Sequence, residues 1–220
     1  MKKTENNITE LVFILDRSGS MYHLTNDTVG GFNSLIDKQK KEDGTCYVST
    51  VLFNDRSEVL YDRVPLSEVR SMTEADFDAS GCTALIDAIG GAIHHIGNVH
   101  KYARPEDVPQ NTLFVIMTDG YENASHQYSS TEVKKLIEKQ KEKYGWEFLF
   151  LGANIDAVET AKHFGISQEF VADYVPDSAG TGIVYEELCK NISSIRSDAC
   201  LASTGLDNIR KDHKTRAKKK

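Results

Sequence analysis

Two short apolar runs constrain the fold of this 220-residue chain more than any other feature. Residues 11–15 (LVFIL) and 112–117 (TLFVIM) are rich in β-branched and aromatic side chains, a pattern typical of short buried strands. Each run is followed directly by polar residues, Asp16 in the first case and Thr118 with Asp119 in the second. The sequence therefore predicts two buried strands that each deliver an aspartate at the carboxyl end.

Further strands and helices are predicted to alternate along the rest of the chain. Apolar periodicity and turn residues predict strands at 46–53, 58–64, 146–151 and 169–172, and helices over about 29–43, 83–96, 129–144, 156–164 and 178–195. We expect Ser129 and Glu132 to form a capping box, Ser178 to cap the last helix, and the pair Gly90 and Gly91 to lie close to a neighbouring backbone. The alternation predicts an α/β fold, with a doubly wound parallel sheet and helices on both faces.

Charge divides the chain into an acidic body and a basic end. The net charge is −7, but seven of the last eleven residues are Lys or Arg and one is Asp, so residues 1–209 carry −13. An acidic body is poorly suited to nucleic acid, which only the basic end could contact weakly. We expect residues 1–205 to form a single domain and residues 206–220 to be a disordered tail that is dispensable for the fold.

Cysteine usage and the lack of long apolar runs bear on the cellular compartment. The four cysteines (Cys46, Cys82, Cys189 and Cys200) form no CxxC pair, which favours reduced thiols over a disulfide framework or a zinc site. The first apolar run has only five residues, which is too short for a signal peptide, and no run approaches the length of a membrane span. These features predict a cytoplasmic protein.

Five oxygen-bearing side chains are placed to meet at one edge of the predicted sheet. Asp16, Ser18 and Ser20 alternate along the loop after the first run, Thr83 opens a helix, and Asp119 follows the second run. If the two runs are neighbouring strands where the strand order reverses, all five side chains lie around one position. Two carboxylates and three hydroxyls suit Mg²⁺ or Mn²⁺, whereas Ca²⁺ prefers more ligands and longer bonds. Taken alone, the first loop could equally hold residues that cap a turn.

Taken together, these stretches resemble the metal-ion-dependent adhesion site (MIDAS) of the von Willebrand factor A (VWA) family. The resemblance spans residues 11–195 and is greatest to intracellular bacterial members. It implies a six-stranded sheet with one antiparallel edge strand at 58–64. It also implies metal binding through Ser18 and Ser20 directly, Asp16 and Asp119 often through water, and Thr83 either way. In the family, the open coordination position commonly accepts an acidic side chain, Asp or Glu, from a partner protein.

The resulting functional hypothesis is a non-enzymatic, divalent-cation-dependent protein-binding module. One alternative is a metal-dependent hydrolase of the phosphatase type, but Ser18 stands where a haloacid-dehalogenase-like enzyme needs a second aspartate. The chain also lacks a Gly-rich phosphate loop and a G-x-S-x-G elbow. The other alternative is a structural subunit that does not use its metal site. His23, Glu122, Asn123 and His126 either shape the binding face or lie in solvated loops, and Asn154 and Asp156 are expected to cap a helix.

Overall fold

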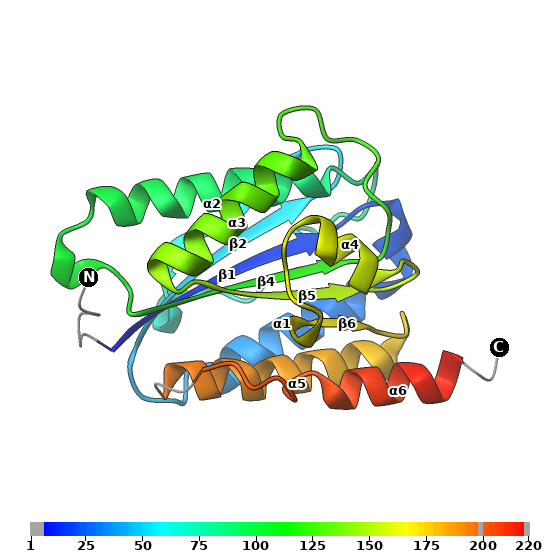
Figure 1. Ribbon diagram of the computed structural model, residues 1–220. Helices are drawn as coiled ribbons and strands as arrows, with labels where there is room; N and C mark the ends of the chain where they lie inside the picture. Colours follow the sequence, from blue (N-terminus) through cyan, green and yellow to red (C-terminus); the bar gives the residue numbers. More distant parts are fainter. Residues whose placement is uncertain (1–6, 198–199, 218–220) are drawn as a thin grey trace.

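The computed structural model of the chain describes residues 7–197 and 200–217, which form a six-stranded sheet between two layers of helices (Figure 1). The strands run in the order β3-β2-β1-β4-β5-β6. Their bounds are β1 Ile8–Asp16, β2 Thr45–Phe53, β3 Ser57–Pro65, β4 Asn111–Thr118, β5 Glu147–Gly152 and β6 Val171–Asp173. All neighbouring strands are parallel except β2 and β3, which form an antiparallel hairpin with β3 at the edge, as the resemblance implies. The predicted fold class and the antiparallel edge strand are thus confirmed.

In the described part of the chain, six α-helices cover the two faces of this sheet. They are α1 Thr25–Gln39, α2 Leu85–Tyr102, α3 Ser130–Tyr144, α4 Ala157–His163, α5 Ser178–Arg196 and α6 Asp207–Ala217. Helices α2, α3 and α4 lie on one face, and α1, α5 and α6 lie on the other (Figure 1). Among the described residues, the longest helices are too polar to cross a membrane.

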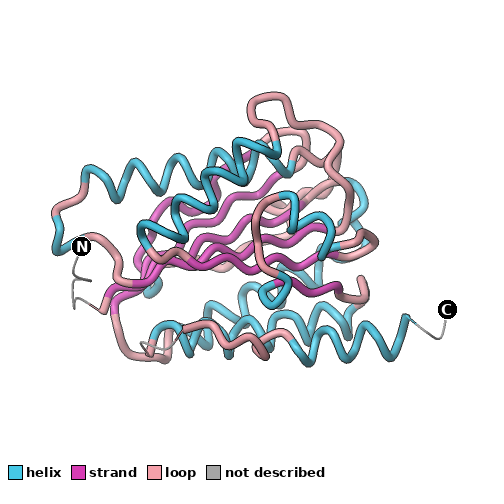
Figure 2. The backbone as a smooth tube through the Cα atoms, viewed as in Figure 1, coloured by secondary structure: helices cyan, strands magenta, loops and turns pink. Residues whose placement is uncertain are grey.

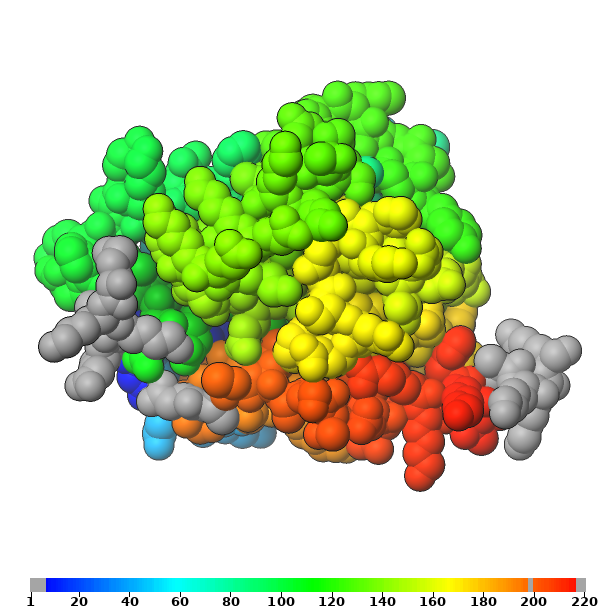
Figure 3. Space-filling model, in the orientation of Figure 1, coloured from blue at the N-terminus to red at the C-terminus, as the bar shows by residue number. Residues whose placement is uncertain are grey.

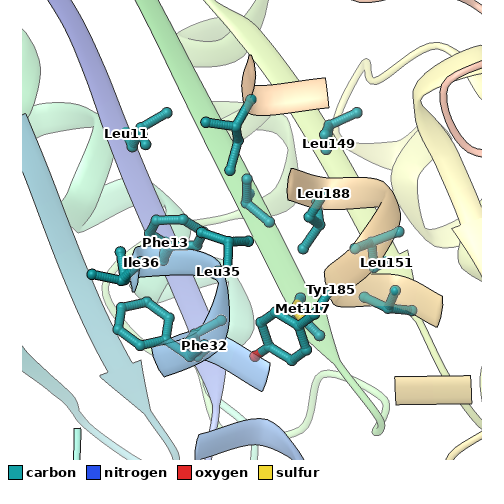
Figure 4. Packing of buried hydrophobic residues seen from close by; sticks show 14 of the residues in the cluster. Leu11, Phe13, Phe32, Leu35, Ile36, Met117, Leu149, Leu151, Tyr185 and Leu188 are labelled. Carbon is teal, nitrogen blue, oxygen red and sulfur yellow. The ribbon is translucent and has the colours of Figure 1, made fainter. Parts of the chain in front are cut away.

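The first apolar run, which lies in β1, contains no polar residue because both faces of this strand are buried. Alternate side chains of a strand point to opposite faces of the sheet, and here both faces are covered. Leu11 and Phe13 belong to the core under α1 and α5, whereas Val12 and Ile14 belong to the core under α2, α3 and α4, and all four are fully buried. Figure 4 shows the first of these cores, where Phe13 packs near residues of α1 and α5.

The helix caps follow the sequence in one case and depart from it in another. Ser129 and Glu132 form the predicted capping box at the start of α3, and Gly145 ends this helix with a φ of +69°. The expectation that Ser178 caps α5 is wrong. Asp177 is the cap and accepts a hydrogen bond from the Gly180 N–H at 2.8 Å, while the Ser178 hydroxyl donates to Asp27 of α1 at 2.7 Å. Asp177 takes this role because its carboxylate reaches the free N–H groups of the first turn.

The disordered tail predicted from residue 206 is wrong for the described part, because residues 207–217 form α6. Figure 3 shows this helix in red, continuous with the orange surface of α5. Leu206 and Ile209 are each 1% exposed and belong to the core under α5. Arg210 donates to the main-chain oxygen of Val171 in the edge strand β6 at 3.1 Å. The final three lysines lie outside the described residues.

The two mid-helix glycines of α2 have different surroundings, and neither approaches a backbone as predicted. A Cβ atom on Gly90 would lie 2.6 to 2.7 Å from ring atoms of Tyr128, so this position has no room for a side chain. A Cβ atom on Gly91 would meet no other atom within 4 Å. Gly90 therefore meets a packing requirement, whereas Gly91 faces open space.

Candidate metal centre

Strands β1 and β4 are neighbours at the centre of the sheet, which meets the condition under which the five side chains would gather around one position. Asp16 is the last residue of β1 and Thr118 is the last residue of β4. From β1 the strand order runs to β2 on one side and to β4 on the other, so the order reverses here. The loops after these strands gather at one edge of the sheet (Figure 2). Ligands of open α/β sheets bind at such a reversal, outside the carboxyl ends of the strands.

Asp16 is fully buried and both of its carboxylate oxygens have donors. Oδ1 accepts a hydrogen bond from the Ser18 N–H at 2.7 Å, and Oδ2 accepts one from the Thr118 hydroxyl at 2.6 Å. Burial raises the pKa of Asp16, although these hydrogen bonds act to lower it. Asp16, at the end of β1, therefore joins the first loop to the end of β4.

Asp119 is joined to the serines of the first loop. The Ser20 hydroxyl donates to Asp119 Oδ1 at 2.5 Å, and the Ser18 and Ser20 hydroxyl oxygens lie 3.1 Å apart. Asp119 Oδ2 is buried and has no hydrogen-bond partner among the described residues. Burial raises the pKa of Asp119, while the Ser20 hydrogen bond and the nearby His23 act to lower it. A buried carboxylate oxygen without a donor is unfavourable unless water or a cation meets it.

Thr83 completes the group of five side chains. It is 3% exposed. Its hydroxyl oxygen and the hydroxyl oxygen of Ser20 both lie close to Gly120. A Cβ atom on Gly120 would lie 3.3 Å from Thr83 Oγ1 and 3.7 Å from Ser20 Oγ. The structure therefore brings together all five side chains that the sequence predicts as metal ligands. That they bind a metal remains a prediction.

Backbone contacts with three other segments fix the loop that carries Thr83. The Gly19 N–H donates to the Gly81 oxygen at 3.1 Å, and the Ala84 N–H donates to the Asn54 oxygen at 2.7 Å. Asn123 pairs with Thr83 twice. Its Oδ1 accepts from the Thr83 N–H at 2.9 Å, and its own N–H donates to the Thr83 oxygen at 3.0 Å.

Glu122 and Asn123 hold the start of α2 and the Thr83 loop, roles that the sequence left open. Glu122 Oε2 accepts from the Ile86 N–H in the first turn of α2 at 2.9 Å, and Oε1 accepts from the Ala124 and Ser125 N–H groups. The residue before α2, Ala84, has no side chain that could cap this helix. The free N–H groups of a helix start need an acceptor from elsewhere. The sequence carries no signal of this need, because it predicts Thr83 at the start of the helix, whereas α2 begins at Leu85.

Other polar residues near the edge have local partners. His94 contacts the Tyr128 hydroxyl at 2.7 Å and His95 contacts Asp62 at 2.7 Å, so the two histidines point in different directions. Asp156 caps α4, which confirms the predicted role. The His126 N–H donates to Asp87 of α2.

The donor set fits a hard divalent cation. Among the residues that the structure describes, no group of three or more His, Cys, Asp or Glu side chains could hold a metal ion. A cation at this edge would therefore depend on hydroxyl oxygens in addition to the two carboxylates. Oxygen donors without imidazole or thiolate suit Mg²⁺ or Mn²⁺.

Solved structures with the same fold include several VWA domains. Proximal thread matrix protein 1 from the mussel byssus, in a form with zinc in its MIDAS motif, is 17% identical over 84% of this chain and 46% of that chain, with a TM-score of 0.57. The VWA protein of Catenulispora acidiphila is 15% identical over 84% of this chain and 42% of that chain, with a TM-score of 0.55. The manganese-loaded TRAP protein of Plasmodium vivax is 18% identical over 81% of this chain and 72% of that chain, with a TM-score of 0.53.

These likenesses show that the chain has the VWA fold. The chain spans less than half the length of the mussel and Catenulispora proteins. No family model and no curated protein sequence matches it.

Proposed function

We propose that this chain, which has the VWA fold, is a non-enzymatic protein-binding module that holds a divalent cation and, through it, an acidic side chain of a partner protein. The observation that carries the proposal is the convergence of five oxygen-bearing side chains at the carboxyl edge of β1 and β4, with a buried Asp119 oxygen that has no donor among the described residues. Solved VWA neighbours with zinc or manganese support a metal at the equivalent edge.

Each of the five residues would have a distinct part in holding the cation. The Ser20 hydroxyl donates a hydrogen bond to Asp119, so the lone pairs of the Ser20 oxygen stay available for a metal. Asp119 Oδ2 and the Ser18 and Thr83 hydroxyls are the other oxygens available. Both oxygens of Asp16 already accept hydrogen bonds, so Asp16 would act on the cation mainly through its charge or through water.

The bound cation would supply the positive charge that attracts the partner. Three of the five ligands are neutral hydroxyls, so the cation keeps part of its charge and favours an anionic oxygen at an open coordination position. A carboxylate of Asp or Glu is the natural donor on a protein partner. We propose Mg²⁺ or Mn²⁺ as the cation and the cytoplasm as the location, the latter because all four cysteines are unpaired.

The hydrolase alternative finds less support in the geometry. A nucleophilic serine needs a base within hydrogen-bond reach. The Ser18 and Ser20 hydroxyls lie 3.1 Å apart, and the carboxylates beside these two serines, Asp16 and Asp119, are the ones that the proposed cation needs. The nearby His23 ring contacts the Ser20 main-chain oxygen at 2.8 Å rather than a hydroxyl.

Thermal melts with metal and with chelator test the metal site. At a Mg²⁺ or Mn²⁺ concentration of about 100 times Kd, the cation should stabilise the fold by about 2.7 kcal/mol. Thr83→Ala should abolish most of this gain, whereas Thr45→Ala, at an exposed threonine of β2, should not. Identical melts with and without metal, and no heat on titration, would show that these residues do not form a metal site.

Capture of partners with and without chelator tests the binding role. Wild type in Mg²⁺ should retain a partner that chelator releases and that Thr83→Ala does not bind. Replacing one Asp or Glu of that partner by its amide should have the same effect as chelator. Equal retention under all conditions would assign recognition to another surface.

A further inference from the structure

A cavity of about 440 Å³ lies between α2 and the strands β2 and β3. Its floor is apolar and includes Val12 and Val51 from the sheet. Helix α2 contributes Ala88, Ala92 and Ile96. This volume is in the range of protein sites that bind small molecules or side chains. Neither the proposed metal ligands nor their hydrogen-bond partners Asn123 and Thr118 line it.

The missing side chain of Gly91 keeps part of this cavity open. Gly91 lines the cavity, and a Cβ atom there would meet no other atom within 4 Å. A glycine inside a helix costs about 1 kcal/mol relative to alanine. Packing therefore does not require glycine at this position, and helix stability disfavours it. The neighbouring Gly90 differs, because the Tyr128 ring occupies the space beside it.

The rim of the cavity has an excess of negative charge. Asp55, Asp62 and Asp87 line it, against the cationic side chain of Arg56. His95 of α2 contacts Asp62 of β3 at 2.7 Å, and both side chains are about half exposed. An apolar floor with a negative rim is complementary to an apolar side chain that lies close to a Lys or Arg.

The cavity begins beside the proposed metal centre. Ala84 lines it and directly follows Thr83 in the chain, and Asp55 lies against Gly81 of the same loop. From Ala84 the lining continues along α2 to Ile96. Twelve helical residues rise about 18 Å, a length that about five residues of extended chain would span.

We propose that this cavity is the docking groove for the partner segment that flanks the metal-coordinating carboxylate. The groove binds an apolar side chain and a Lys or Arg of the partner segment. Both residues lie on the same side of the carboxylate in the partner sequence and within about five residues of it. This inference rests on the proposed function, because the carboxylate at the metal fixes where the segment begins.

A library of displayed peptides tests the groove directly. Each peptide carries a fixed Asp between two randomised flanks, and selection uses the full chain in Mg²⁺ with a parallel selection in chelator. The sequences enriched only in Mg²⁺ should carry an apolar residue and a Lys or Arg on one particular side of the Asp.

Gly91→Leu then measures the contribution of the groove. It should weaken the enriched peptides by about tenfold or more, the effect of losing one buried apolar contact. Its melting temperature should equal or exceed that of wild type, because leucine favours the helix and has room there. Its gain in stability with Mg²⁺ should match that of wild type. The matched control is Gly30→Leu at an exposed glycine of α1, where a Cβ atom also meets nothing within 4 Å.

The outcomes separate this inference from the proposed function. Enrichment of Asp peptides in Mg²⁺ without a preference in either flank would overturn the groove and leave the metal-dependent binding intact. Equal peptide affinity for Gly91→Leu and Gly30→Leu would do the same. No enrichment in Mg²⁺ over chelator would overturn both proposals.

Discussion

At the scale of single residues, Asp119 carries its charge where burial opposes it. Because the pKa of Asp119 is raised in the folded chain, its ionised form costs folding free energy above that raised pKa. The cost disappears at a pH below the ordinary pKa of aspartate, where the folded and unfolded chains both bind the proton. We expect Asp119→Asn to be more stable than wild type in chelator at pH 7, by about 1–3 kcal/mol, because the amide has no charge for burial to oppose.

Melts of wild type and Asp119→Asn at several pH values, with chelator and with saturating Mg²⁺, check this. In chelator, the difference in stability between the variant and wild type should shrink as the pH falls through the acidic range. In saturating Mg²⁺, wild type should be the more stable of the two. Asp78→Asn, at an exposed aspartate, is the control. A variant less stable than wild type in chelator would show that Asp119 is stabilised by the protein itself.

Asn123 offers a second test at this scale, because it positions Thr83 without touching the proposed cation. Asn123→Ala should weaken Mg²⁺ binding by about 10- to 100-fold, as is usual when a residue that orients a metal ligand is lost. Asn123→Asp keeps an oxygen that can accept from the Thr83 N–H, and it should retain most of the affinity. Calorimetric titration of both variants measures the difference, and equal weakening in both would contradict the positioning role.

The five candidate ligands could be predicted from sequence because each lies within a few residues of the end of a strand or the start of a helix. Strand ends in a parallel sheet share one edge, so the position of Asp16 and Asp119 follows from the order of elements. Glu122 and Asn123 could not be predicted in the same way. Their roles depend on how two loops cross, and no periodicity in the sequence reports the path of a loop.

At the scale of elements, Asp76 is one of the residues that hold the segment between β3 and α2. The Asp76 carboxylate accepts two hydrogen bonds from Arg70 at 2.7 and 2.8 Å. Its main-chain oxygen accepts one from Arg17, in the loop after β1, at 3.0 Å. The Arg70 guanidinium holds the pKa of Asp76 well below its usual range. Stability from this pair is therefore present above the ordinary aspartate pKa and is lost as the pH falls.

Asp76→Asn should accordingly lower the free energy of unfolding by about 1 kcal/mol at pH 7, a modest value because Arg70 is half exposed. The gap between wild type and variant should narrow as the pH falls below about 4. Denaturant unfolding at neutral and acidic pH measures the gap, with the exposed Glu74→Gln as control. A gap that does not change with pH would rule out the charge as its cause.

Helix α6 gives a second prediction at this scale. A chain that ends at Gly205 loses the burial of Leu206 and Ile209 and the cover that Arg210 gives to the edge strand β6. We expect a loss of about 3–6 kcal/mol, from about 1.5–3 kcal/mol for each buried apolar side chain. A chain that ends at Ala217 is the control for the terminal lysines. Unchanged melting of the shorter chain would show that α6 contributes no stability.

The sequence did not reveal α6 because only two apolar residues anchor it. Leu206 and Ile209 lie one turn apart at its start, and the remaining contacts come from charged side chains such as Arg216, which pairs with Asp177 at 2.6 Å. Composition alone classifies such a segment as solvated. Its order depends on surfaces of α5 and β6 that exist only in the folded chain.

At the scale of the whole molecule, the alternation of strands and helices was sufficient to predict a doubly wound sheet. The number of strands and the antiparallel edge came from the resemblance to VWA domains, and the structure confirms both. The cavity under α2 could not be predicted, because it depends on which way Gly91 faces. Sequence identifies the glycine, and only the packed fold shows that the space beside it is open.

The proposed ligands come from three segments that are far apart in the chain, and this spacing has a kinetic consequence. Ser20 and Asp119, which share a hydrogen bond, are separated by 99 residues, so their site exists only after β1 and β4 have paired. A cation that binds only the assembled site stabilises the folded state and leaves the transition state for folding unchanged. Mg²⁺ at about 100 times Kd should slow unfolding by about 100-fold and leave the refolding rate unchanged. Stopped-flow kinetics with Mg²⁺ and with chelator would show this, and faster refolding in Mg²⁺ would contradict it. The supply of metal would then set how long each folded molecule lasts, while the speed of its formation stays a property of the chain alone.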